Sequence, residues 1–174
     1  MIESLRVSNF YCFKEKTTIS FVAKKERNRV LDNEFCGFSP KNKVNILKLI
    51  YLLGNNGSGK SKMLYAFDAL RYLVVNARER HDDLLRHKPF AFDEVCLDRP
   101  SRIEIVYHID DKRFSYTIEW DKYAIYNENL KEIKGKNDIE LFHRWYDADN
   151  ELVKIDFMPK MYVSDDEAYI IKSS

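Results

Sequence analysis

VNILKLIYLLGNNGSGKS, residues 44–61, contains three of the chain's five glycines and decides the expected fold. Val44 to Leu53 is an apolar run of strand length that leaves no polar face for solvent, which is typical of a buried strand. The glycines that follow predict a turn. From Lys60 to Arg80, apolar residues recur at spacings of three and four, which predicts an amphipathic helix. A buried strand, a glycine loop and a helix are therefore expected in succession.

The loop matches the Walker A pattern, in which four residues separate a first glycine from a Gly-Lys-Ser end. Its residues are Gly54, Asn55, Asn56, Gly57, Ser58, Gly59, Lys60 and Ser61. Glycine lets the main chain wrap closely around a phosphate chain at the positive end of a helix. Lys60 is then the catalytic cation facing the β and γ phosphates, and Ser61 is the Mg²⁺ ligand. The pattern predicts binding of ATP and Mg²⁺, with the two asparagines and Ser58 shaping the loop on its γ-phosphate side.

The segment before this loop combines strand patterns with a polar excursion. Apolar residues from Ile2 to Phe10 and the alternation from Thr17 to Val22 predict an amino-terminal β-hairpin. Residues 23–45 are polar and contain Gly37 and Pro40, so we expect a long loop there.

The second half of the chain predicts antiparallel β structure over residues 101–156. Alternation on both sides of Asp110-Asp111 predicts one hairpin, residues 123–133 a further strand, and residues 140–155 another hairpin. The expected fold class is mixed α/β, in a single lobe over residues 1–174.

Composition excludes several classes of protein. The chain has 174 residues, of which 45% are hydrophobic and 33% charged, so it can form one ordinary core and is not a disordered tail. Its 29 basic and 28 acidic residues leave a net charge of +1, which argues neither for nor against a nucleic-acid partner. Three widely spaced cysteines oppose a disulfide framework, and the longest apolar stretch is too short to span a bilayer. We expect a cytoplasmic protein with no membrane contact.

The order of the amino-terminal segments resembles the first lobe of ABC-type ATPase heads. This group includes the structural-maintenance-of-chromosomes, RecF-like and overcoming-lysogenization-defect proteins. The resemblance rests on residues 6–13, the strand from Thr18 to Val22, and residues 53–61. It implies a P-loop NTPase lobe of the ABC-ATPase-head type, in which a hairpin precedes the P-loop strand and its helix.

A closer resemblance is to the prokaryotic AAA-annotated, ABC-like ATPase family of abortive-infection and anti-phage defence proteins. It covers most of the chain and rests on short segments that occur in the family's order. These segments are residues 70–76, 88–93, 100–105, Tyr116 and 140–144. The resemblance implies a cytoplasmic ATPase that forms a homo-oligomer through its heads and acts with a nuclease domain or partner protein.

The sequence does not contain the family's signature motif, Walker B strand or switch histidine. Residues 161–167 look like Walker B only superficially, because Pro159 and Lys160 interrupt the apolar run. We therefore expect the chain to be the amino-terminal lobe of a larger protein, completed by a carboxy-terminal half and a second head.

Two other functions stay open at this point. A self-contained P-loop kinase or small NTPase needs an acidic Mg²⁺ partner within the chain, and only Asp165 to Glu167 could provide it. A nucleotide-gated binding module would bind ATP without hydrolysing it.

The remaining features each allow a functional and a structural interpretation. The resemblance to ABC-type heads implies that Asn9, Phe10 and Phe13 help to seat the adenine base. The structural alternative is that they fix the first hairpin to the core. Cys12 is expected to be a buried filler. Basic residues gather at 24–29 and 78–88. They could contact DNA or RNA phosphates, but solvated surface charge is the favoured interpretation.

Overall fold

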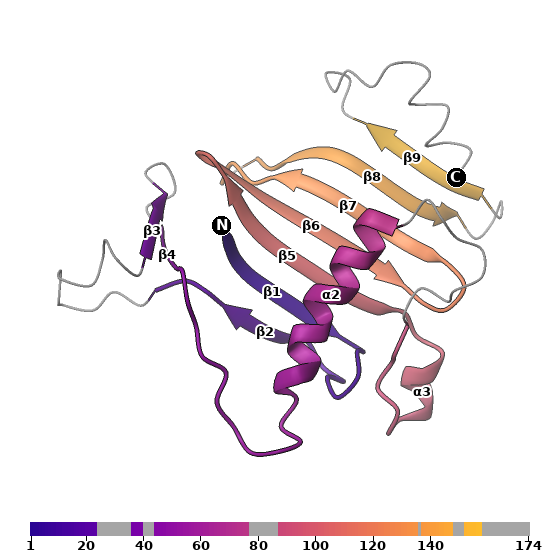
Figure 1. The fold of residues 1–174 in the computed structure, drawn as a ribbon. Helices are drawn as coiled ribbons and strands as arrows, with labels where there is room; N and C mark the ends of the chain where they lie inside the picture. Colours follow the sequence, from indigo (N-terminus) through magenta and orange to yellow (C-terminus); the bar gives the residue numbers. More distant parts are fainter. Residues whose placement is uncertain (24–35, 40–43, 77–86, 136, 148–151, 158–174) are drawn as a thin grey trace.

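The computed structural model describes residues 1–23, 36–39, 44–76, 87–135, 137–147 and 152–157 (Figure 1). These residues form nine strands and two helices: β1 (Ile2–Ser8), β2 (Thr17–Ser20), β3 (Cys36–Ser39), β4 (Val44–Leu47), α2 (Lys60–Asn76), α3 (Glu94–Leu97), β5 (Ser101–Ile109), β6 (Lys112–Trp120), β7 (Ile125–Glu132), β8 (Ile139–Asp147) and β9 (Leu152–Phe157).

Seven of these strands form one sheet in the order β2-β1-β5-β6-β7-β8-β9. Every neighbouring pair in it is antiparallel. From β5 to β9 each strand pairs with the next along the chain, as the alternation over residues 101–156 predicted. β1 lies between β2 and β5, with Leu5 opposite both Ile19 and Ile105. The first hairpin is therefore part of the same sheet as the second half of the chain.

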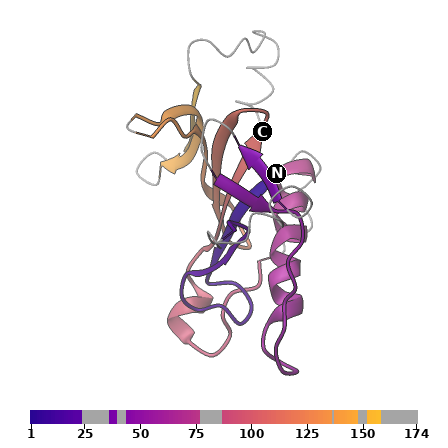
Figure 2. The same cartoon turned by 90° about the vertical axis from the view of Figure 1, so that its left-hand side faces the viewer.

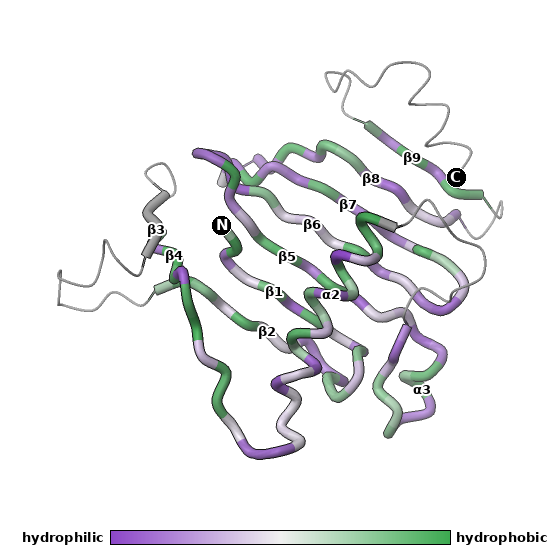
Figure 3. The backbone as a smooth tube through the Cα atoms, in the orientation of Figure 1, coloured by the Kyte–Doolittle hydropathy of each residue, from purple (hydrophilic) through white to green (hydrophobic). Residues whose placement is uncertain are grey.

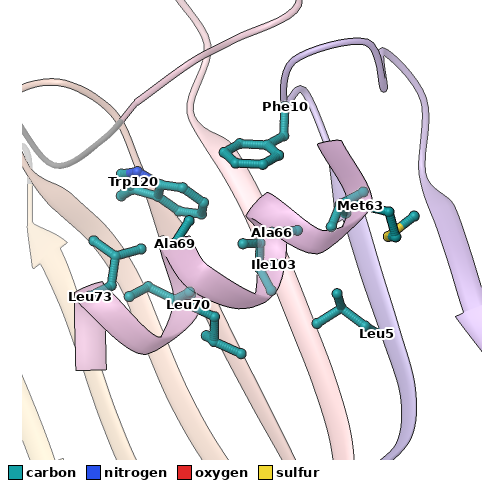
Figure 4. Packing of buried hydrophobic residues seen from close by; sticks show 11 residues of the cluster. Leu5, Phe10, Met63, Ala66, Ala69, Leu70, Leu73, Ile103 and Trp120 are labelled. Atoms are coloured by element: carbon teal, nitrogen blue, oxygen red, sulfur yellow. The ribbon is translucent and has the colours of Figure 1, made fainter. Parts of the chain in front are cut away.

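Helix α2 lies across one face of this sheet, and Figure 2 shows the helix to one side of the strands. Its inward residues follow the three-and-four spacing read from the sequence. Eleven buried side chains from α2, β1, β5, β6 and the turn after β1 form the core (Figure 4): Leu5, Val7, Phe10, Met63, Ala66, Ala69, Leu70, Leu73, Ile103, Ile118 and Trp120. Two of the five buried α2 residues on this face, Ala66 and Ala69, are alanines, which lets the helix backbone approach the sheet closely.

A buried ionic cluster ties the start of β1 to the β5–β6 hairpin. The carboxylate of Glu3 contacts His108 Nε2 at 2.8 Å and accepts hydrogen bonds from Arg113 Nε at 2.7 Å and Nη2 at 2.6 Å. Burial alone would raise the pKa of Glu3, but these hydrogen bonds and the nearby positive charge outweigh it and lower the pKa below its ordinary value. Glu3 is therefore held as a carboxylate.

The expected fold class is wrong. Strands account for 49% and helices for 17% of the described residues, the main sheet is antiparallel, and no strand leads into the glycine loop in these residues. The predicted P-loop strand, Val44 to Leu53, ends at Leu47 as β4. It pairs antiparallel with β3 outside the main sheet. A P-loop NTPase α/β fold requires the loop to follow a strand of a parallel sheet, and this chain does not have that arrangement.

The physical reason lies in residues 48–53, which continue the apolar run without a strand partner. Tyr51 and Leu53 are 79% and 90% exposed. Figure 3 shows this apolar stretch descending from β4 to the loop. An apolar run indicates a preference for burial, but it does not specify which strand will cover it.

Several smaller expectations are confirmed and others are corrected. The first hairpin, the strand over 123–133 and both later hairpins are present. The helix from Lys60 is described as far as Asn76. The excursion over 23–45 is not all loop, because it contains β3 and the start of β4. The connector between Pro89 and Pro100 contains the short α3.

Among the described residues, neither helix has the length and apolar character needed to cross a bilayer.

Replacing Leu73 with Ala tests the packing of α2 on the sheet. Leu73 is 2% exposed, so Leu73→Ala should lower the free energy of unfolding by about 2–5 kcal/mol. Val74 is its neighbour and 55% exposed, so Val74→Ala should change this free energy by about 0.5 kcal/mol or less. Urea denaturation measures the free energy of unfolding of both variants. Equal losses of this free energy would contradict the assignment of Leu73 to the helix face that packs on the sheet.

Replacing Glu3 with Gln tests the ionic cluster and its pH dependence. Since the folded pKa of Glu3 is lowered, its carboxylate stabilises the fold above the unfolded pKa near 4.5, and this contribution is lost as the pH falls through the folded pKa. Glu3→Gln should cost about 1–3 kcal/mol at pH 7, with the difference from wild type shrinking below pH 4.5. Glu15→Gln, at an exposed position, is the charge-matched control; a pH-independent difference would refute the assignment.

Candidate functional site

The glycine loop connects the exposed residues 51–53 to the first turn of α2. Its backbone turns at Ser58, whose N–H donates to Asn55 O at 3.2 Å. Met63 N–H donates to Gly59 O at 3.0 Å, so Gly59 belongs to the hydrogen-bonded start of the helix. Residues 54–58 are exposed, while Gly59 and Lys60 are half-buried. The loop is therefore open to solvent at the amino-terminal end of a 17-residue helix.

Lys60 is the first residue of α2, and its side chain folds back over the loop. Nζ donates hydrogen bonds to Gly54 O at 2.7 Å, Asn55 O at 2.8 Å and Ser58 Oγ at 3.3 Å. All three acceptors are neutral. In the part of the chain that the structure describes, no carboxylate pairs with this ammonium group. Within the described residues, the loop thus holds a positive charge that is hydrogen-bonded to neutral oxygens.

Two of the loop glycines have backbone conformations that favour glycine. Gly57 and Gly59 have φ of +81° and +90°. A Cβ on Gly57 would meet nothing within 4 Å, whereas one on Gly59 would lie 2.8 Å from Cys12 Sγ. Gly59 is therefore required by its dihedral angle and by a close neighbour, and Gly57 by its dihedral angle alone.

A pocket of about 370 Å³ opens beside the loop, within the size range of small-molecule sites. Most of its lining is apolar, with Lys60 as the charged group. The lining residues are Phe13, Thr18, Ile19, Tyr51, Leu52, Leu53, Ser58, Gly59, Lys60 and Met63. The pocket therefore combines one cation with an apolar wall.

The predicted Mg²⁺ ligand, Ser61, is exposed in the first turn of α2 next to Lys60. Ser61 does not line the pocket beside the loop. Among the described residues, no cluster of three or more His, Cys, Asp or Glu side chains could hold a metal ion by itself.

A second depression, of about 380 Å³, lies on the sheet over β5 to β8. Its polar side chains already bind one another. Asn129 Nδ2 donates to Glu140 at 2.6 Å, Lys131 pairs with the same carboxylate at 3.3 Å, and His143 contacts Asn127 at 2.9 Å. Because its charges are balanced internally, we place the candidate site at the glycine loop.

Two of the three residues considered for the adenine base have a structural role. Phe10 is 1% exposed in the core, and the Asn9 side chain is fully used within the protein. Asn9 Nδ2 donates to Cys96 O and Arg99 O, both at 2.8 Å, and Oδ1 accepts from Phe90 N–H at 3.1 Å. The alternative interpretation, fixing the hairpin to the core, is therefore correct for both.

Only Phe13 of that group lines the pocket. The expectation for Cys12 as a buried filler is wrong, because Cys12 is exposed and its sulfur lies against the loop. Sequence reasoning missed this contact because 47 positions separate Cys12 from Gly59. The alternation that places Thr18 and Ile19 on a strand was the one available signal for the pocket wall.

Several expected features lie outside the described residues. They are Lys24, Lys25, Arg27, Arg29, Arg78, Arg80 and Arg86 of the basic clusters, the helix end over 77–80, and the Walker B-like residues 161–167.

Comparison of the sequence with protein-family models gives no match, and comparison with curated protein sequences gives none either.

Proposed function

We propose that the loop from Gly54 to Ser61 binds the phosphate chain of ATP together with Mg²⁺. The observation that carries this proposal is the ammonium group of Lys60, which lies over the loop at the start of α2 and pairs with no carboxylate of the described residues. Backbone N–H groups at a helix start and an adjacent lysine are the two elements that bind phosphate without a dedicated fold. The order Gly-x₄-Gly-Lys-Ser supports the same ligand class.

Binding requires Lys60 to exchange its acceptors. In the structure, Nζ donates hydrogen bonds to two backbone carbonyls and one hydroxyl. A phosphate oxygen carries negative charge, so its hydrogen bond to the ammonium is stronger than those it replaces. The exchange therefore favours triphosphate over neutral ligands. Ser61 would hold Mg²⁺, which neutralises charge on the β and γ phosphates when it is bound.

The proposed activity is ATP hydrolysis when further groups complete the site. Hydrolysis needs an acidic group that orients water and Mg²⁺. We propose that a carboxy-terminal half and a second copy of the protein supply these groups, as the family resemblance implies. The base would lie against the apolar wall of the adjoining pocket, where Phe13 offers an aromatic surface.

Replacing Lys60 with Met tests the binding proposal. Since Lys60→Met removes a charge-assisted hydrogen bond to phosphate, the affinity for Mg-ATP in isothermal titration calorimetry should fall about ten- to a hundredfold. Lys62→Met is the matched control. Lys62 is two residues further along the same helix, and its Nζ lies 4.3 Å from the centre of the Tyr11 ring.

The control should change affinity about threefold or less, because Lys62 lies outside the loop. An equal loss in both variants would mean that general surface charge, not the loop, attracts the nucleotide. If wild-type protein shows no binding of Mg-ATP, the proposed function is wrong.

A second prediction concerns the anti-phage role and the nuclease partner, which rest on the resemblance. In cells that express the natural protein, Lys60→Ala should abolish protection against phage while protein levels stay unchanged, because Lys60 is not part of the core cluster. Plaque counts and immunoblots measure both quantities. Full protection by the Lys60→Ala variant would remove the defence assignment.

A further inference from the structure

The turn between β1 and β2 lies directly against the glycine loop. A Cβ on Gly59 would come within 2.8 Å of Cys12 Sγ and 3.4 Å of Phe13 Cζ. Contacts under 3.0 Å do not occur for real Cβ atoms, so the turn occupies the space next to Gly59. The loop therefore rests against the edge formed by Cys12 and Phe13.

This edge is held firmly in place by the rest of the turn. Phe10 and Phe13 exchange backbone hydrogen bonds of 3.0 and 2.9 Å, and Tyr11 N–H donates to Lys88 O at 2.6 Å. The Phe10 ring is part of the core and packs edge-on against Tyr11 at 4.8 Å between ring centres. Hydrogen bonds and ring packing therefore fix the edge to the core and to the segment at Lys88.

The position of Gly59 in turn determines the start of α2. Gly59 O accepts the first of the helical hydrogen bonds, from Met63 N–H at 3.0 Å. Lys60 follows directly, so a displacement of Gly59 also moves the lysine and the N–H groups that face a ligand. A steric stop at Gly59 therefore sets the geometry of the whole phosphate-binding segment.

We propose that Cys12 and Phe13 are positioning residues that act as this steric stop and hold the loop in the geometry that binds a triphosphate. The inference rests on the proposed function. Neither residue needs to contact a phosphate. Their effect passes through Gly59, and it should therefore appear in the affinity for the phosphate chain itself, including one that lacks a nucleoside.

A double-mutant cycle between Cys12 and Gly59 separates positioning from ordinary packing. The probes are Mg-ATP and sodium tripolyphosphate, measured by calorimetry, with the melting temperature of each unliganded variant as the stability readout. Cys12→Ala alone should weaken both ligands about threefold, because the stop is removed, while Cys12→Ser should restore most of the affinity.

In the Gly59→Ala background, the effect of Cys12→Ala should change sign. Gly59→Ala places a methyl group against the sulfur and should weaken both ligands strongly. Removing the sulfur in this background should then raise the affinity for both ligands about tenfold. Gly57→Ala is the matched control: it has the same positive φ without a neighbour within 4 Å, so Cys12→Ala should give no recovery there.

The outcomes distinguish this inference from the proposed function. If wild-type protein binds neither probe, both are wrong. If wild type binds and Cys12→Ala has the same effect in all three backgrounds, the steric stop is wrong and the proposed function stands. If Cys12→Ala changes the melting temperature but not the affinity for tripolyphosphate, the Cys12 contact contributes only to packing. That result would also overturn the inference.

Discussion

The packing of α2 against β1, β5 and β6 is the contact on which the rest of the described structure depends. One helix covers the core of a seven-stranded sheet, and it can lie close to the strands because Ala66 and Ala69 face them. The same contact directs the amino-terminal end of α2 toward the first hairpin (Figure 1). The candidate site is thus positioned by apolar packing that begins one turn further along, at Met63.

A second, polar constraint holds the segments around the site together. Asn9 has φ of +48°, and its side chain bonds to the backbone of residues 90, 96 and 99. Ser101 Oγ donates to Asn9 O, which connects the turn to the first residue of β5. Asn9 and Ser101 are buried, so each of these hydrogen bonds is costly to lose. The turn beside the loop is consequently fixed to the connector that precedes β5.

Local patterns in the sequence predict elements well but do not predict their partners. The alternation over residues 101–120 and the spacing from Met63 to Leu73 each describe one element, and both are observed. The run from Val44 to Leu53 is equally apolar, yet only β4 is a strand. Whether such a run is buried depends on a neighbouring strand, which the run itself does not specify. The prediction of a mixed α/β fold was wrong because it assumed that the whole run was a strand of the main sheet.

The same contrast between local patterns and tertiary contacts applies to the candidate site. The loop residues and the proposed role of Lys60 both come from one short motif, because the spacing of the motif is what predicts phosphate binding. The contact of Cys12 with Gly59 and the pocket wall from β2 could not, since they join segments brought together only by tertiary packing. Asn9 was considered for the adenine base because of the resemblance to ABC-type heads, but its amide is used by backbone partners within the protein.

The position of β1 in the sheet has a consequence for the order in which the chain folds. β5 to β9 pair with their sequence neighbours, whereas Leu5 pairs with Ile105, a hundred positions away. Closing a chain segment of that length carries a larger entropic cost than forming a hairpin, and distant pairings form slowly. We therefore expect strands β5 to β9 to pair with one another first and β1 to pair with β5 later. The turn after β1 would reach the glycine loop only in that final step. The loop would therefore take up its final geometry only when the whole sheet has formed.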